Sequence, residues 1–221
     1  MTPAPAQIVK AVNEGLKMYS DAVADAPRYP LRAVDEYEQW FKSDFMTAIS
    51  KRLTIEQGRW KATPDSHKVI GIAGALALKG CNTILLPVVN HWIETEYPKL
   101  WQRGLKYNRI MAEMQGYPEP ESFNDNDLAQ INILVTGEIA TQLDHVDHHR
   151  RYVERSVSSA LALGWTNERF LKAMTVPLGI VGYPYGNLRY SWRTHIIRMI
   201  EGRARAVFAS ASESRALEVE A

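Results

Sequence analysis

The stretch from residue 128 to residue 163 reads LAQINILVTGEIATQLDHVDHHRRYVERSVSSALAL, and it decides the fold class. Apolar residues recur in it at steps of three, four or seven, which is the spacing of one face of an α-helix. The positions are Ile131, Val135, Ile139, Leu143, Val146, Val153, Val157 and Leu161. The pattern predicts one long helix that follows a cap at Asn124 or Asp125 and ends at Gly164.

The same spacing continues toward both ends of the chain. Apolar stripes predict helices over about residues 8–23, 34–53 and 65–78, and Gly80 is placed to end the third of these. A second long helix is expected from Asn82 to about residue 114, bent or interrupted at Pro87 and Pro98 because proline lacks an amide donor. After residue 164 we expect a short helix capped by Thr166, a Gly- and Pro-rich connector over 177–187, and a last helix from near Leu188. No segment is typical of a strand.

The sequence therefore predicts an all-α protein, an elongated bundle of about six to eight helices, two of them long and kinked. Residues 1–64 are expected to form an N-terminal helical region and residues 65–209 a helical core. Residues 210–221 are poor in large apolar side chains and are expected to form a flexible tail.

The composition is that of an ordinary folded domain, with 46% hydrophobic and 23% charged residues. A formal net charge of +1 excludes a whole-protein attraction to nucleic acid or membrane, so a polyanion site would have to be local. The longest apolar run ends at Lys79, short of the ~20 residues of a membrane crossing, so no membrane span is expected. The single cysteine, Cys81, has apolar neighbours that predict a buried thiol with a raised pKa and suit a reducing compartment.

One segment of the long helix carries the sharpest local chemical signal. Asp144 and His148 share one helix face at positions i and i+4, and His145 and His149 share the adjacent face. Each such pair can clamp a divalent transition metal. This pattern leaves open a metal-dependent helical enzyme as the alternative function.

The competing interpretation of this segment is an exposed face of ion pairs, formed by Asp144, Asp147, Arg150 and Arg151. It is favoured because motifs of this length often arise by chance. The sequence contains no nucleophile elbow and no phosphate-binding loop, so the leading hypothesis has no enzymatic activity and no cofactor.

The last predicted helix combines five arginines with a single acid, Glu201, over residues 188–205. The arginines are Arg189, Arg193, Arg198, Arg203 and Arg205. At 100° per residue, three of them (Arg189, Arg193 and Arg203) fall on the apolar side of the helix. This mixture favours a helix docked on a protein partner or an acidic surface, while ordinary surface arginines and a nucleic-acid-binding helix remain open.

Three features follow one another in the second half of the chain: an aromatic-then-glycine step, an Ala-Leu-x-x-Gly step before a small helix, and a closing helix with two arginines and a glutamate. They occupy residues 97–104, 160–170 and 193–201. In this order they resemble the Mu F-type head-morphogenesis family, the minor head proteins of tailed bacteriophages, over about residues 85–209. The family places Thr and Glu directly after the second arginine, whereas here Met199 and Ile200 stand between Arg198 and Glu201. The first ~80 residues match nothing in the family.

The resemblance implies a structural or assembly protein of the virion at the head or the portal and head–tail junction. It implies portal protein, major capsid protein or both as partners, packaged DNA as a further candidate partner, and an oligomeric arrangement. The protein would be made in the host cytoplasm and assist genome packaging or ejection. Arg193, Arg198 and Glu201 would form a structural ion-pair set in the closing helix.

Overall fold

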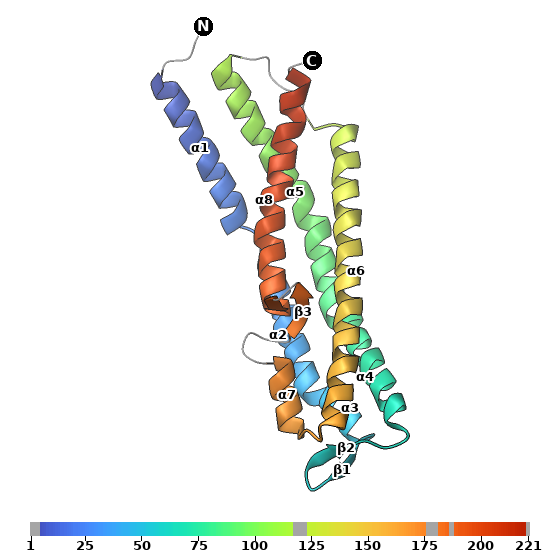
Figure 1. Ribbon diagram of the computed structural model, residues 1–221. Coiled ribbons are helices and arrows are strands. Elements are labelled where there is room, and N and C mark those ends of the chain that lie inside the picture. The colour runs from blue at the N-terminus through green and yellow to red at the C-terminus, as the bar shows by residue number, and fades with distance from the viewer. Residues whose placement is uncertain (1–4, 117–122, 176–180, 186–187, 220–221) are drawn as a thin grey trace. The chain divides into compact units, whose positions relative to one another are not determined.

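The computed structural model describes residues 5–116, 123–175, 181–185 and 188–219, and confirms an all-α fold (Figure 1). The helices of these residues join into six continuous segments, at the lower end of the expected number. They are α1 (Pro5–Ala24), α2–η1–α3 (Pro30–Trp40, Phe41–Phe45, Met46–Ser50), α4–η2–α5 (Ser66–Gly80, Cys81–Leu85, Leu86–Gln115), α6 (Asp125–Ala162), α7 (Asn167–Thr175) and α8 (Trp192–Val219). The segments η1 and η2 are π-helical turns.

Two short antiparallel hairpins join these helices, so the prediction of no strands is wrong. The first pairs β1 (Thr54–Glu56) with β2 (Arg59–Lys61), and the second pairs β3 (Val181–Tyr185) with β4 (Leu188–Ser191). The first turn is tight because Gln57 and Gly58 both have positive φ, 49° and 74°. The second hairpin occupies part of the expected connector, and the last helix therefore begins at Trp192, after the expected start at Leu188.

The helix that was expected to end at Gly80 continues instead into the second long helix, and neither Pro87 nor Pro98 interrupts it. Gly80 is helical, and the ring of Trp40 fills the place of its missing Cβ, so glycine here permits a close contact. The turn η2 follows, and it ends with the amide of Leu86 bonded to the carbonyl of Cys81, just before Pro87. The wider π turn lets the helix continue past a residue that has no amide donor. Pro98 also lies inside α5.

This continuous helix, Ser66–Met114, is long and apolar enough to cross a membrane by length and composition alone. Its most apolar 18-residue window has a mean hydropathy of 1.8, and 44% of that window is buried within the protein. The expectation of no span rests on the apolar run ending at Lys79, whereas the helix continues past that residue. A packed core helix passes the same test, and Gly74 of this helix lies directly against the side chain of Glu154.

The chain forms two compact units, each assembled from separate parts of the sequence. Unit 1 contains residues 1–28, 91–139 and 198–221, and unit 2 contains residues 29–90 and 140–197. The expected division at residue 64 does not describe this grouping, because both units draw on both ranges.

In unit 1, the described residues of α1, α5, α6 and α8 share an apolar core. The ring of Phe208 lies 5.6 Å from the rings of both Tyr19 and Tyr107. Asn108 donates a hydrogen bond to the carbonyl of Ser212, and Ala211 is fully buried. The expected flexible tail is therefore wrong for residues 210–219, which continue α8.

Unit 2 has an aromatic core built from α2, η1, β2 and α7. The rings of Phe41 and Phe45 stack at 4.1 Å, and Trp60 packs 4.8 Å from Phe170. One capping prediction is confirmed in unit 2, whereas Asn82, expected to begin a helix, lies inside η2. Thr166 accepts the amide of Arg169 at the start of α7, as expected.

Candidate interaction site

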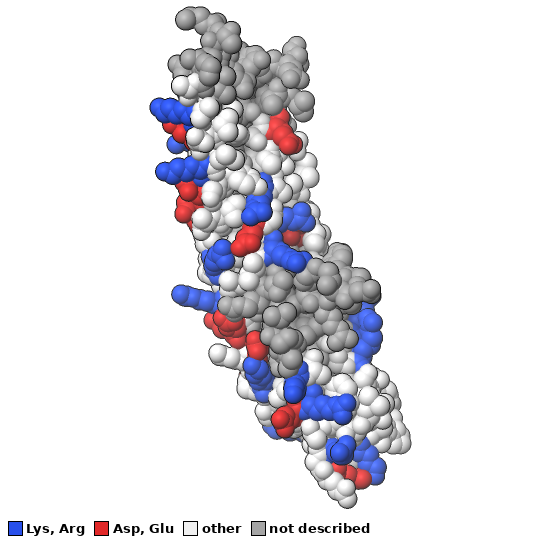
Figure 2. All heavy atoms as spheres, turned by 60° about the vertical axis from the view of Figure 1, so that its left-hand side comes forward, with Lys and Arg blue, Asp and Glu red and all other residues white. Residues whose placement is uncertain are grey.

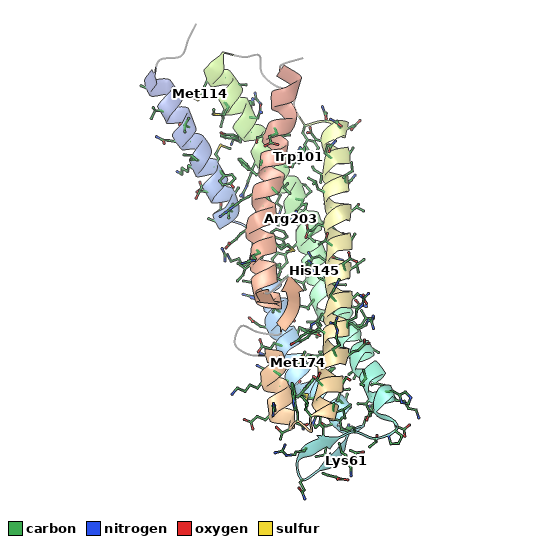
Figure 3. The ribbon with its side chains drawn as sticks, in the orientation of Figure 1. Lys61, Trp101, Met114, His145, Met174 and Arg203 are labelled. Atoms are coloured by element: carbon green, nitrogen blue, oxygen red, sulfur yellow. The ribbon has the colours of Figure 1, made fainter. Side chains whose placement is uncertain are left out.

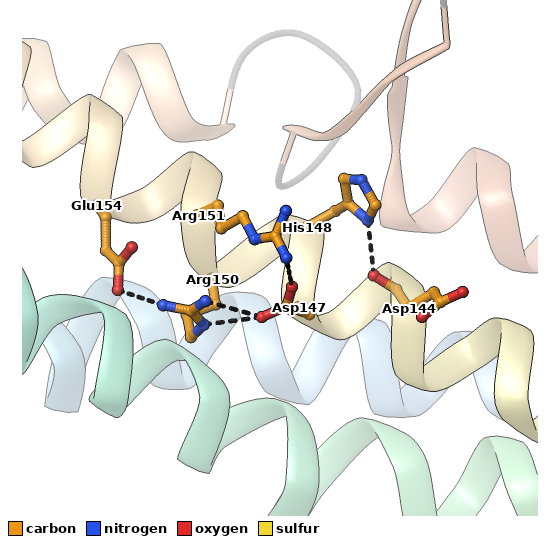
Figure 4. A network of polar contacts seen from close by, with 6 residues as sticks. All are labelled: Asp144, Asp147, His148, Arg150, Arg151 and Glu154. Carbon is orange, nitrogen blue, oxygen red and sulfur yellow. Dashed lines mark hydrogen bonds and ion pairs between the residues drawn. The ribbon is translucent and has the colours of Figure 1, made fainter.

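The four predicted metal ligands do not form one set. Asp144 and His148 are exposed on α6, and the ring Nδ1 of His148 lies 2.9 Å from the carbonyl oxygen of Asp144 (Figure 4). His145 and His149 are buried on the other face. Two i,i+4 pairs that start one residue apart are rotated by about 100°, so one pair faces the core and the other faces solvent. In the described residues, no three His, Cys, Asp or Glu side chains are placed to hold a metal ion.

The ion-pair interpretation of this segment is confirmed for Asp147, Arg150 and Arg151. Arg150 contacts Asp147 at 2.8 Å and Glu154 at 2.7 Å, and Arg151 contacts the other oxygen of Asp147 at 2.5 Å (Figure 4). The hydrogen bond from Arg150 lowers the pKa of Asp147, and the reciprocal bond raises the pKa of Arg150. The backbone carbonyl of Asp144 contacts His148 and takes no part in these ion pairs.

His149 belongs to a buried polar group that the sequence did not predict. The hydroxyl of Tyr37 lies 2.9 Å from Nε2 of His149, and the thiol of Cys81 contacts the same hydroxyl. Burial lowers the pKa of His149 to about 3 and raises the pKa of Cys81 to about 12. It also raises the pKa of Tyr37 well above its usual value. All three groups are therefore neutral near pH 7, and the predicted raised pKa of Cys81 agrees with this environment.

A sequence signal for the burial of His149 was present. The residue lies three positions after Val146 and four before Val153, which places it on the apolar stripe of α6. Both valines are buried, as is His149. The polar residues on both sides of His149 obscure this spacing in the sequence.

The five arginines of the predicted partner-binding helix do not share one environment. Arg189 lies in β4, outside the helix, and Arg193 lies in the first turn of α8; their side chains lie outside the described part of the chain. Arg198 and Arg205 are exposed on α8. Arg203 makes an internal ion pair.

The ion pair of Arg203 joins α8 to α6 within unit 1. Its Nε lies 2.7 Å from an oxygen of Glu138, whose side chain is only 6% exposed. The same carboxylate faces the buried Tyr97; burial, and then Glu138, raise the pKa of that phenol, while Arg203 lowers it. A buried carboxylate without a cation would be costly, so Arg203 has a structural role.

The expected ion-pair set of Arg193, Arg198 and Glu201 stays a prediction, because the side chain of Arg193 lies outside the described part of the chain. The carboxylate of Glu201 pairs with Arg28 at 3.2 Å. Arg28 lies 173 residues earlier in the chain, so no local pattern could have predicted this partner.

Helix α1 shows an exposed apolar stripe, here called the α1 stripe, formed by Val9, Val12 and Leu16. These side chains are 60%, 44% and 62% exposed. The packed face of this helix contains Gly15, which lies against the ring of Tyr107. A helix with one packed face and a second apolar face in solvent is typical of an interaction site.

Comparisons with known proteins add no family assignment. The chain matches no protein-family model, and its comparison with curated proteins and with solved structures found no significant match. The resemblance to the phage minor head proteins therefore stays a prediction.

Proposed function

We propose that this protein is a non-enzymatic structural or assembly protein of a tailed-phage virion. In this proposal it lies at the head or the portal and head–tail junction, where it is oligomeric and binds portal protein, major capsid protein or both. It is made in the host cytoplasm and assists genome packaging or ejection. The resemblance over residues 85–209 supports the virion location, and the α1 stripe supports a binding role.

The α1 stripe is the observation that carries the proposal. Each large aliphatic side chain that moves from water into an interface contributes about 1.5–3 kcal/mol. Val9, Val12 and Leu16 lie within 60° of one another around the helix, so one partner surface can cover all three. A contact of this size is small for a binary complex but suits a component held by several neighbours in an assembly.

The outer face of α8 offers a second contact surface in unit 1. Arg198 and Arg205 are exposed and lie two turns apart on the same side of the helix. Guanidinium groups at this spacing can form charge-assisted hydrogen bonds with carboxylates of a partner protein.

Mass spectrometry of purified phage particles tests the location directly. We expect the protein in the particles, at a copy number below that of the major capsid protein. Absence of the protein from every particle would contradict the proposal.

A pair of variants tests the α1 stripe. The double variant Val12→Ser and Leu16→Ser should be incorporated at least about tenfold less well, because tenfold corresponds to only about 1.4 kcal/mol. The control is Asn13→Ser and Lys17→Ser, two exposed positions on the same helix. Equal incorporation of the two variants would show that the stripe is not the contact.

A further inference from the structure

One end of unit 2 carries a concentration of positive charge that the arginine pattern of the last helix did not predict. Seven cations and three acids, Glu56, Asp65 and Glu168, give this end a formal charge of +4. We call it the basic end. Its cations are Lys51, Arg52, Arg59, Lys61, Lys68, Arg169 and Lys172. All seven of these side chains are exposed. Blue side chains outnumber red ones at the lower end of Figure 2.

Hydrogen bonds between distant segments bring these cations together. The amide of Trp60 donates to the carbonyl of Trp165 at 2.8 Å, and the indole of Trp60 donates to Asn167 at 2.6 Å. Asn167 in turn donates to the hydroxyl of Ser50 at 3.4 Å. The end of α3, the hairpin β1–β2 and the start of α7 therefore meet at one place, with Lys61 on the hairpin (Figures 1 and 3).

The platform beneath the cations is well packed. Trp60 is 1% exposed, and its ring lies 4.8 Å from Phe170, which is fully buried. A charged surface on a rigid support loses little conformational entropy when it binds. The basic end is thus better suited to binding than the same charges on an isolated loop.

Acidic neighbours balance only two of the seven cations in the described contacts. Lys61 pairs with Glu56 at 2.6 Å, and Lys68 pairs with Asp65 at 2.7 Å. The excess positive charge comes from the other five cations, which are Lys51, Arg52, Arg59, Arg169 and Lys172.

The three arginines in this excess are oriented by uncharged groups. Arg52 donates to the carbonyl of Ala48, and Arg59 donates to that of Gly164. Arg169 lies over the ring of Trp165 at 5.0 Å. Each guanidinium has five N–H donors, so these contacts leave donors for a ligand.

We propose that the basic end binds the phosphate backbone of duplex DNA without reading its base sequence. Four of the seven cations are lysines, which protein interfaces disfavour but phosphate contacts use freely as point charges. The exposed large apolar residues of the same segments are Ile55 and Leu163, a small apolar surface for a protein partner. The proposal does not depend on the proposed virion location and concerns a different unit from the α1 stripe.

The salt dependence of binding measures the number of phosphates contacted. Each neutralised phosphate contributes about −0.9 to the slope of log K against log salt concentration. Five engaged cations therefore predict a slope of about −4.5 for the wild-type protein. The probe is a fluorescein-labelled DNA duplex of about 30 base pairs and mixed sequence. Binding is measured by the fluorescence anisotropy of the duplex at NaCl concentrations between about 50 and 200 mM.

Two variants with the same change in net charge test the location. The first removes three cations of the basic end. Its substitutions are Lys51→Gln, Arg169→Gln and Lys172→Gln. The slope should become shallower by about 2.7, because three phosphate contacts are lost. Circular dichroism should show the same helix content as in the wild type.

The control variant removes three exposed lysines of unit 1. Its substitutions are Lys10→Gln, Lys17→Gln and Lys106→Gln. It should keep the wild-type slope. An equal loss in both variants would show that net charge alone drives binding, and no binding of the wild type at about 50 mM NaCl would also overturn the proposal. Equally tight binding to poly-glutamate or to phosphatidylserine vesicles would refute a preference for DNA.

Discussion

Gly104 is the position where one added methyl group should report most directly on the packing of unit 1. A Cβ built at Gly104 of α5 would lie 2.5 Å from the carbonyl oxygen of Phe208 and 2.7 Å from the Cβ of Ala211, both on α8. Cβ atoms in proteins essentially never approach other atoms more closely than about 3.0 Å. Because one of the two contacts is a backbone atom, Gly104→Ala requires a shift of α8 itself.

Two opposing effects set the size of the change. Alanine stabilises a helix interior by about 1 kcal/mol relative to glycine. Overpacking a tight contact costs about 1–3 kcal/mol, and a clash with backbone favours the upper part of that range. The expected net loss for Gly104→Ala is about 1–2 kcal/mol of the free energy of unfolding. Its Tm should fall by about 2–8 °C, at about 2–4 °C per kcal/mol for a chain of this length.

Urea unfolding followed by far-ultraviolet circular dichroism provides the measurement, with Gly202→Ala as the control. Gly202 is helical and exposed on α8, and a Cβ there would meet no atom within 4 Å. The control should therefore gain about 0.5–1 kcal/mol from helix propensity alone. If Gly104→Ala were as stable as wild type or more so while the control behaved as expected, α5 and α8 would not be in the contact described.

Three further substitutions probe polar contacts. Arg203→Met should lower the free energy of unfolding by about 1–3 kcal/mol, because it leaves Glu138 buried without its cation. The control Arg205→Met should change that free energy by less than about 0.5 kcal/mol. Adding Glu138→Gln to Arg203→Met should recover part of the loss, and no recovery would argue against the ion pair. The pKa of His149, about 3, lies below the unfolded value of about 6.5, so the unfolded state binds the proton first as pH falls. The free energy of unfolding should therefore fall as the pH drops below ~6.5, by about 2 kcal/mol between pH 7 and 5. In urea titrations, His149→Gln should abolish this part of the pH dependence. Thr166→Ala should lower stability by about 1 kcal/mol through the lost cap on α7, and an unchanged Tm would show that the cap is not needed.

Features with local partners were predictable from the sequence. The cap of α6 is one example, because the side chain of Asn124 accepts the amides of Asn126 and Asp127, two and three residues away. Gly164 is another, with a φ of +60° that favours glycine at a helix end. In each case the residue type and the structure it stabilises lie within one turn of chain.

Features with distant partners were not predictable in this way. Gly80 looked like a helix terminator, but the ring of Trp40, forty residues earlier, explains its small size. The strands of the first hairpin are three residues each, too short to show an alternating pattern, and Trp60 is fixed by Trp165 more than one hundred residues later. Secondary-structure propensity and hydrophobic periodicity can be read from the sequence, but in these places tertiary contacts outweighed both.

The residues of the candidate site also differ in whether their partners are near or far in the sequence. The ion pairs among Asp147, Arg150 and Arg151 are helix neighbours and were predicted, whereas the pairing of Arg203 with Glu138 joins residues far apart in the chain. An apolar stripe over about residues 8–23 was predicted, but the exposure of the α1 stripe depends on which face of α1 the other helices cover.

The two π turns have different consequences for changes in chain length. A π turn holds one residue more than an α turn, so deleting one residue from it can restore ordinary helical bonding while the flanking helices keep their faces. The turn at Phe41–Phe45 can lose a residue in this way, because the residue that follows it, Met46, has a backbone amide to donate to an ordinary helical hydrogen bond. At Cys81–Leu85 the deletion would leave Pro87 inside an ordinary helix, at a cost of about 3 kcal/mol. Related chains should therefore differ in length at the first turn and keep the extra residue at the second for as long as the proline is present.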